Sequence, residues 1–147
     1  MQIYKLNKLS DTNNKISLPL YSSSVPAGFP SPAEDYIDSS IDLNKHLVPR
    51  PNSTFIVKVQ GDSMIDAKIT SGDILVIDKS LQPKNGQVIL AIIDGEFTVK
   101  RYTFIDGKPV LKAENSKYPA IDINDNSNFQ IWGVVTYVIH QCDSQSI

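Results

Sequence analysis

The sequence predicts a mostly β protein: an antiparallel β domain with one short helix and an extended N-terminal arm. Short segments rich in Val, Ile, Phe and Thr recur from residue 54 onward, and turn-forming pairs containing Gly, Asn, Asp or Pro separate them. The chain has 147 residues and is 41% hydrophobic. This size and composition suit one domain with a hydrophobic core plus an additional segment.

The first third of the chain differs in composition from the rest. Residues 1–20 hold one short apolar alternation among polar residues, and the stretch from Tyr21 to Asp35 is rich in Ser, Pro and Gly. Because proline fixes φ and removes a backbone donor, we expect this stretch to be an extended, irregular arm.

The single expected helix covers residues 38–48. Serine residues that can cap a helix are followed there by Ile41, Leu43 and Leu47, and Pro49 ends the pattern. Strands account for the regular structure that we expect after this point. They are Thr54–Val59, Asp73–Asp78, Gln87–Ile93, Glu96–Phe104, Pro109–Ala113 and Phe129–His140. Asp94-Gly95, between two of these runs, is typical of a two-residue hairpin turn.

Charge and composition exclude several classes of function. The net charge is −2 and the Lys and Arg residues are scattered, which disfavours direct DNA binding. The longest apolar run, residues 88–93, is far too short to cross a membrane, so we expect a soluble protein. The single cysteine, Cys142, allows no intramolecular disulfide, and no secretion signal precedes the arm, which points to the cytoplasm. The acidic residues match no metal-ligand order, so no metal and no cofactor are expected.

Ser63 is the first candidate catalytic residue. It stands in Gly61-Asp62-Ser63-Met64-Ile65-Asp66, directly after an expected strand, where a turn can present its hydroxyl. Asp62 or Ser63 can also be interpreted as the cap of a short helical turn over residues 64–69. The two interpretations are compatible, since free backbone N–H groups at a helix start can hold the oxyanion of a tetrahedral intermediate.

Lys100 is the second candidate. It lies in the strand pattern Glu96–Phe104, where a lone lysine is usually a solvated surface residue. A neutral amine can remove the proton of a serine hydroxyl, but an exposed lysine, with a pKa of about 10.4, stays protonated near neutral pH. Burial disfavours the charge, and a fall of about three pKa units costs roughly 4 kcal/mol.

Taken together, these motifs resemble the LexA/UmuD family of self-cleaving proteins, the S24 type of serine peptidases. The resemblance spans nearly the whole chain in order. The matching residues are Gly28-Phe29-Pro30-Ser31-Pro32-Ala33 with Asp35-Tyr36, Ile41-Asp42-Leu43-Asn44, Gly61-Asp62-Ser63-Met64-Ile65-Asp66, Gly72-Asp73, Asp94-Gly95-Glu96-Phe97-Thr98-Val99-Lys100 and Gly133-Val134-Val135.

The resemblance implies a role for each matching position. Ser63 matches the nucleophile, Lys100 the general base, and Ala27-Gly28 the bond that is cut; Ala27 stands where some members of the family have Cys. Residues 1–37 then form an arm that carries the cleavage site, and residues 38–147 form the peptidase domain with the β fold shared by LexA and signal peptidases.

The resemblance also implies partners. Family members form homodimers, cleave themselves in the SOS response to DNA damage when a RecA filament on single-stranded DNA stimulates them, and join a UmuC-like Y-family polymerase in error-prone translesion synthesis. Two alternatives stay open: a non-catalytic module that docks on such a polymerase, and a soluble protease similar to signal peptidases.

Overall fold

The chain divides into two compact units. The computed structural model describes residues 2–8, 15–21, 37–123 and 128–143. One unit combines Met1–Ser10 with Arg50–Ile147, and the other is Asp11–Pro49. These boundaries differ from those of the expected arm (1–37) and peptidase domain (38–147). The expected boundaries follow from the predicted cleavage site, and they stay a prediction.

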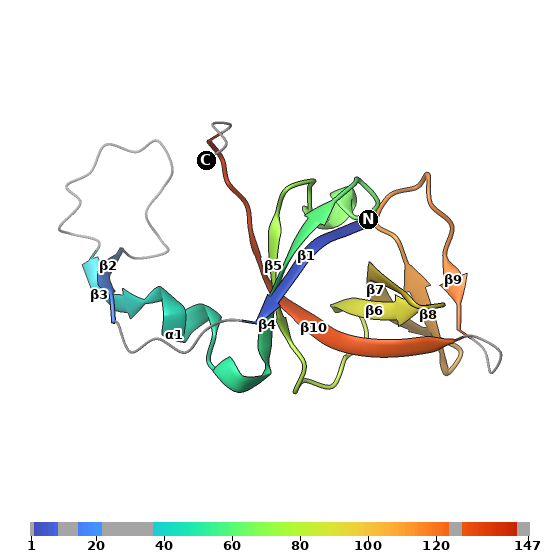
Figure 1. Ribbon diagram of the computed structural model, residues 1–147, viewed down its shortest axis with the longest axis horizontal. Coiled ribbons are helices and arrows are strands. Elements are labelled where there is room, and N and C mark those ends of the chain that lie inside the picture. Colours follow the sequence, from blue (N-terminus) through green and yellow to red (C-terminus); the bar gives the residue numbers. More distant parts are fainter. Residues whose placement is uncertain (1, 9–14, 22–36, 124–127, 144–147) are drawn as a thin grey trace. The chain divides into compact units, whose positions relative to one another are not determined.

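The larger unit is an eight-stranded sheet in which every neighbouring pair is antiparallel (Figure 1). The strand order is β1-β4-β5-β10-β6-β7-β8-β9. The strands are β1 (Gln2–Lys8), β4 (Thr54–Gln60), β5 (Ile74–Asp78), β6 (Val88–Ile93), β7 (Glu96–Ile105), β8 (Lys108–Lys112), β9 (Ile121–Asp122) and β10 (Phe129–Ile139). Two 3₁₀ helices, η2 (Pro51–Ser53) and η3 (Ile65–Ala67), flank β4. The predicted mostly β, antiparallel fold is confirmed.

The six strands expected from residue 54 onward are all present, with bounds within two residues of those predicted. The sequence analysis missed β1 and β9. β1 pairs with β4 from Gln2↔Gln60 to Lys8↔Phe55, so its partner lies about fifty residues away in the chain. A local pattern of apolar residues does not reveal such a partner, because the first residues of the chain alternate polar and apolar side chains only weakly.

The smaller unit contains the remaining regular structure. β2 (Ser17–Tyr21) pairs antiparallel with β3 (Ile37–Asp42), and α1 (Leu43–Leu47) follows β3 directly. The expectation of a helix over residues 38–48 was therefore wrong in its first half. The cap is Asp42, whose Oδ1 accepts a hydrogen bond from the Asn44 N–H at 3.0 Å. Of the Pro-rich stretch expected to be irregular, Tyr21 to Asp35, Tyr21 is the last residue of β2 and the rest lies outside the described residues.

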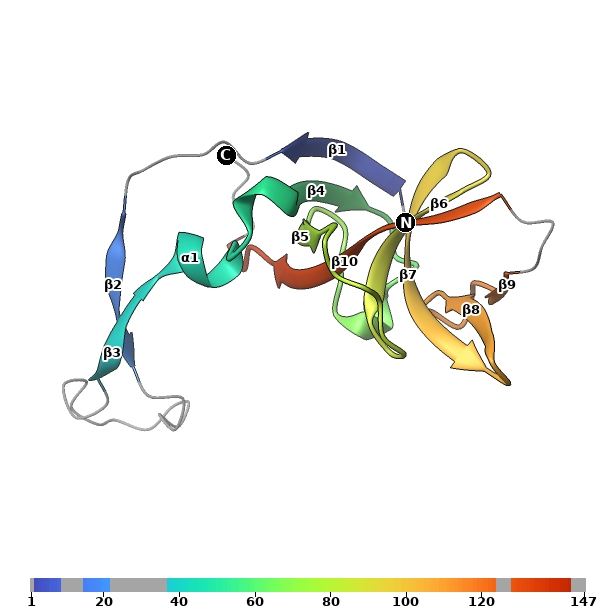
Figure 2. The same ribbon diagram turned by 90° about the horizontal axis from the view of Figure 1, so that it is seen from below.

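β10 joins the two halves of the large sheet (Figure 2). Its first half pairs with β6 and its second half with β5, and the register shifts once in each half, at Trp132 and at Thr136. Gly133 lies beside the first shift. A Cβ atom there would stand 2.5 Å from Cγ2 of Ile77 and 3.3 Å from the carbonyl oxygen of Asp78. Only glycine allows β10 to approach β5 this closely.

The hydrophobic core forms two clusters, one on each face of β6 and β7. The first contains Leu90 and Val99, and the second contains Ile89, Ala91 and Tyr102. Their other members come from the remaining strands and from the turn after β4: Val57, Val59, Met64, Ile69, Leu75 and Ile77 in the first cluster, and Leu111 and Val134 in the second. Burial on both faces explains why residues 88–93 form a continuous apolar run.

We predict that Gly133→Ala lowers the free energy of unfolding by about 1–3 kcal/mol, because the added methyl group overpacks the contact with Ile77. Urea unfolding measures the change. The matched test repeats the substitution in an Ile77→Leu background, which removes the Cγ2 methyl group. The cost of Gly133→Ala should be smaller there, and an equal cost in both backgrounds would contradict the steric explanation.

Asp78 ties the end of β5 to the segment before β4. Its carboxylate accepts hydrogen bonds from the Ser80 hydroxyl (2.6 Å) and the Ser80 N–H (2.8 Å), from Arg50 Nε (2.5 Å) and from the Ser53 hydroxyl (2.9 Å). Burial to 3% exposure acts to raise the pKa of Asp78, but the hydrogen bonds from Ser80, Arg50 and Ser53 outweigh it and lower the pKa to about 2.

We predict that Asp78→Asn lowers the free energy of unfolding near neutral pH by about 2 kcal/mol. The folded-state pKa of about 2 lies below the ordinary value of 3.8, so the carboxylate stabilises the fold fully above pH 3.8 and loses this effect as the pH falls toward 2. Urea unfolding between pH 2 and 7 should show the wild-type and variant curves converge at the acid end. Asp94→Asn, at an exposed turn, is the control and should leave the curve unchanged.

Candidate functional site

Ser63 lies in the turn between β4 and β5. β4 ends at Gln60, and Gly61, at a φ of 110°, turns the chain into η3. The Ser63 residue is 1% exposed and its neighbour Met64 is fully buried in the first core cluster. The turn is therefore anchored in the core by Met64, which explains why a polar residue is held beneath the surface here.

The interpretation of Asp62 or Ser63 as a helix cap was wrong. The N-cap residue of η3 is Met64, which makes no side-chain cap hydrogen bond. The Asp62 carbonyl oxygen instead accepts a hydrogen bond from the Ile65 N–H at 3.2 Å, and the Lys68 backbone, at a φ of 64°, ends the helix. The backbone of Asp62, rather than its side chain, thus shapes the start of η3.

Lys100 lies in the middle of β7, opposite Ile89 of β6. It is 7% exposed, whereas a lone lysine in a strand is usually solvated. Burial lowers its pKa from the ordinary value of 10.5. Within the described part of the chain, no ion pair includes Lys100, so no carboxylate there offsets the loss of hydration. Its environment therefore favours the neutral amine, which is the form that can accept a proton.

Residues 114–118, which follow β8, contact the segments on both sides of the site. The Glu114 carbonyl oxygen accepts a hydrogen bond from the Asp66 N–H at 2.7 Å, and Asn115 Nδ2 donates to the Asp62 carbonyl oxygen at 2.9 Å. The Glu114 carboxylate pairs with Nε of Arg101, the residue after Lys100, at 2.7 Å. The Ser63 turn and the Lys100 strand are thus bound to the same short segment.

A further hydrogen bond runs from the Tyr118 hydroxyl to Asp62 Oδ1 at 2.8 Å. This bond and the negative charge of Asp62 raise the pKa of Tyr118, and desolvation adds to the shift. The sequence analysis did not single out Glu114, Asn115 or Tyr118. No local pattern marks them, since their partners in the turn lie roughly fifty residues earlier in the chain.

The structure thus buries two of the predicted site residues, Ser63 and Lys100, in one unit, and residues 114–118 contact neighbours of both: Asp62 and Asp66 around Ser63, and the Arg101 side chain next to Lys100. The approach of the Ser63 hydroxyl to the Lys100 amine stays a prediction. Ala27 and Gly28, the predicted cleavage site, lie outside the described residues.

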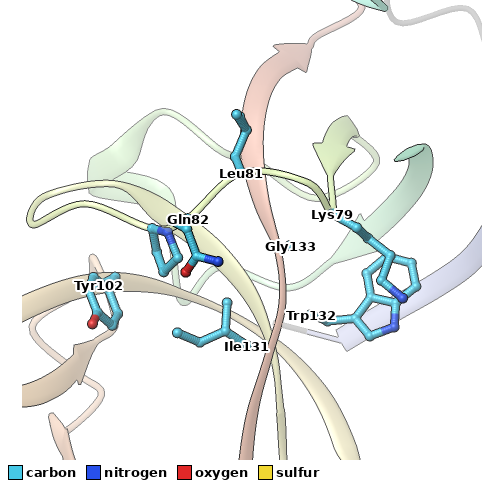
Figure 3. A pocket seen from close by; sticks show the side chains of 8 residues that line it. Lys79, Leu81, Gln82, Tyr102, Ile131, Trp132 and Gly133 are labelled. Atoms are coloured by element: carbon cyan, nitrogen blue, oxygen red, sulfur yellow. The ribbon is translucent and has the colours of Figure 1, made fainter. Parts of the chain in front are cut away.

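A pocket of about 250 Å³ lies on the larger unit, and neither Ser63 nor Lys100 lines it (Figure 3). Its lining residues are Lys79, Leu81, Gln82, Pro83, Tyr102, Ile131, Trp132 and Gly133. The Lys79 ammonium stands 4.4 Å from the centre of the Trp132 ring, and Phe55 and Phe97 pack edge-on against the same ring. The Lys79 ammonium therefore makes a cation–π contact with Trp132 at the edge of this pocket.

Among the helices of the described residues, none is long and apolar enough to cross a bilayer.

Comparison with known proteins identifies the family to which this chain belongs. A family model described as Peptidase S24-like matches residues 19–136. Protein ImpA from Shigella flexneri is 42% identical over 123 residues, covering 84% of this chain and 83% of that protein. Protein MucA from Escherichia coli is 41% identical over 122 residues, covering 82% and 83%. The LexA repressor of Shewanella piezotolerans is 36% identical over 132 residues, covering 89% of this chain and 63% of the repressor.

The fold, the buried serine and lysine, and these similarities define a peptidase-type β domain. The chain belongs to the S24 peptidase family, in the LexA/UmuD group of that family.

We predict that Tyr118 ionises above its ordinary pKa of 10.0, because its hydroxyl donates to the Asp62 carboxylate. Ultraviolet titration of the phenolate absorbance, taken as the difference between wild type and Tyr118→Phe, isolates this residue among the six tyrosines. Asp62→Asn should lower the Tyr118 midpoint, because the negative charge is removed. Equal midpoints in both proteins would contradict the hydrogen bond.

Proposed function

We propose that this protein is a self-cleaving serine peptidase that cuts its own chain between Ala27 and Gly28, with Ser63 as the nucleophile and Lys100 as the general base. The observation that carries the proposal is the burial of Lys100 in β7 without a counter-ion in the described residues. Burial lowers its pKa and favours the neutral amine that such a base requires.

The chemistry follows from these two groups. The neutral Lys100 amine accepts the proton of the Ser63 hydroxyl while the hydroxyl oxygen attacks the carbonyl carbon of Ala27. The resulting ammonium then gives its proton to the Gly28 nitrogen as the peptide bond breaks. Water hydrolyses the ester left on Ser63, with Lys100 again as the base, and the products are residues 1–27 and 28–147.

Burial of an uncompensated lysine also separates this proposal from a purely structural role. A module that only docks on a polymerase has no need of this group, and an apolar side chain in its place would avoid the cost of dehydrating an ammonium ion. The family match supports the same choice, since the chain belongs to a family of peptidases.

The biological role that we propose is in SOS mutagenesis. The relatives named above, ImpA, MucA and the LexA repressor, support this context. In this role the protein is a cytoplasmic homodimer, and a RecA filament on single-stranded DNA stimulates its cleavage. The trimmed dimer then acts with a UmuC-like Y-family polymerase in translesion synthesis. A RecA filament would act by favouring the state in which the arm is docked at Ser63, which is a population shift rather than new chemistry.

We predict that Ser63→Ala and Lys100→Met each abolish self-cleavage of the purified chain at alkaline pH, measured by the masses of the two fragments. Lys100→Met should also raise the free energy of unfolding, because it removes a buried ammonium group but keeps the volume of the side chain. Lys108→Met, at an exposed position in β8, is the matched control and should cleave at the wild-type rate.

The pH dependence gives the second part of this test. Because the base must be neutral, the wild-type rate should rise with pH and level off below the ordinary lysine value of 10.5. A rate that does not depend on pH, or a Lys100→Met protein that still cuts at Ala27-Gly28, would exclude the lysine as base. Fragments other than 1–27 and 28–147 would exclude the cleavage site.

A further inference from the structure

We propose that Asn115 and Tyr118 are positioning residues for the nucleophile: they hold Asp62, and through it the backbone that carries Ser63, in the geometry needed for attack. This inference rests on the proposed self-cleavage and adds two residues that act through another group rather than on the scissile bond itself.

Asp62 is held at two separate points. Asn115 Nδ2 donates to its carbonyl oxygen at 2.9 Å, and the Tyr118 hydroxyl donates to its side-chain Oδ1 at 2.8 Å. On the other side of Ser63, the Asp66 N–H donates to the Glu114 carbonyl oxygen at 2.7 Å. The segment from 62 to 66 is therefore fixed at both ends by residues 114–118, with Ser63 between the fixed points.

Residues 114–118 also form hydrogen bonds among themselves. Asn115 Oδ1 accepts a hydrogen bond from the Lys117 N–H at 3.0 Å, and the Asn115 carbonyl oxygen accepts one from the Tyr118 N–H at 3.0 Å. The first bond occupies the oxygen of the Asn115 amide, so its NH₂ group points toward Asp62. The two donors thus reach Asp62 from a turn that has internal hydrogen bonds of its own.

The same segment is bound to the strand of the proposed base. Glu114 pairs with Arg101 Nε at 2.7 Å, and Arg101 Nη1 donates to the Gly86 carbonyl oxygen at 2.7 Å. Arg101 directly follows Lys100 in β7. Residues 114–118 therefore contact both the turn of the proposed nucleophile, which joins β4 to β5, and the strand of the proposed base, β7. In the sheet, β10 and β6 lie between β5 and β7.

The exposure of these groups argues against a purely stabilising role. Tyr118 is 42% exposed and Asp62 is also exposed, so their hydrogen bond competes with water and adds little to the stability of the fold. The reaction rate is more sensitive than the stability to the position of these groups, because a displacement of about 1 Å of a reacting group can slow a reaction about a hundredfold. Loss of the Tyr118 hydroxyl should therefore affect the cleavage rate more than the stability.

The test compares self-cleavage of the full chain at alkaline pH in wild type, Tyr118→Phe and Asn115→Ala. We expect each substitution to slow cleavage about tenfold, the effect of losing one hydrogen bond to a charged or buried group. The thermal midpoint should change little in Tyr118→Phe. Ser116→Ala and Lys117→Ala, at exposed positions of the same turn, are the matched controls and should cleave at the wild-type rate.

Two readouts distinguish positioning from general destabilisation. Tyr118→Phe should have no further effect in an Asp62→Ala background, because the partner of the hydroxyl is then absent. The pH at which the rate is half-maximal should be the same in wild type and Tyr118→Phe, since the base itself is unchanged. A shifted pH profile, or equal effects of Tyr118→Phe in both backgrounds, would overturn the positioning role.

The outcomes separate the two proposals. If wild type cleaves at Ala27-Gly28 and both Tyr118→Phe and Asn115→Ala cleave at the wild-type rate, the positioning role is rejected and the self-cleavage stands. If wild type and the controls do not cleave at alkaline pH, the proposed function is rejected and the positioning role is rejected with it.

Discussion

The burial of one lysine side chain is the constraint on which the candidate site depends. An ammonium group withdrawn from water is unfavourable, and the protein bears this cost at Lys100, in the middle of β7, where no ion pair with a described residue offsets it. The sheet makes the burial possible. β6 and β7 are covered on both faces by the two core clusters, so a side chain on either face is shielded from solvent. The chemical consequence is a lowered pKa, which shifts Lys100 toward the neutral amine.

The position of β10 helps to explain how β6 is buried on both faces in such a small domain. β10 lies between β5 and β6 and pairs with both, and its two register shifts let one strand serve two halves of the sheet. Gly133 permits the close approach to Ile77 and Asp78 that this arrangement needs. Asp78 in turn is fixed by hydrogen bonds to Ser80, Arg50 and Ser53. β5 and β10 thus meet at a point where hydrogen bonds from Ser80, Arg50 and Ser53 hold the buried carboxylate of Asp78.

The turn that carries Ser63 is held differently from the strand that carries Lys100. Met64 anchors the turn in the core, while residues 114–118 bind its backbone from the outside through Asp62 and Asp66. The ion pair between Glu114 and Arg101 connects this outer segment to β7. The proposed proton transfer from Ser63 to Lys100 requires such a link, because it depends on the distance between the two groups. The contacts of residues 114–118 meet this requirement.

The sequence by itself determined the strands from residue 54 onward, since alternating β-branched residues and Gly-containing turns are local signals. It also determined the candidates Ser63, Lys100 and Ala27-Gly28, because these stand in motifs that keep their spacing. Only the tertiary structure decided that residues 38–42 form a strand, since β2 supplies the partner, and that the backbone of Asp62 shapes the turn instead of a side-chain cap. It alone revealed Asn115 and Tyr118 as well. Hydrogen bonds between residues more than fifty positions apart depend on how the chain folds back on itself, and no local pattern encodes them.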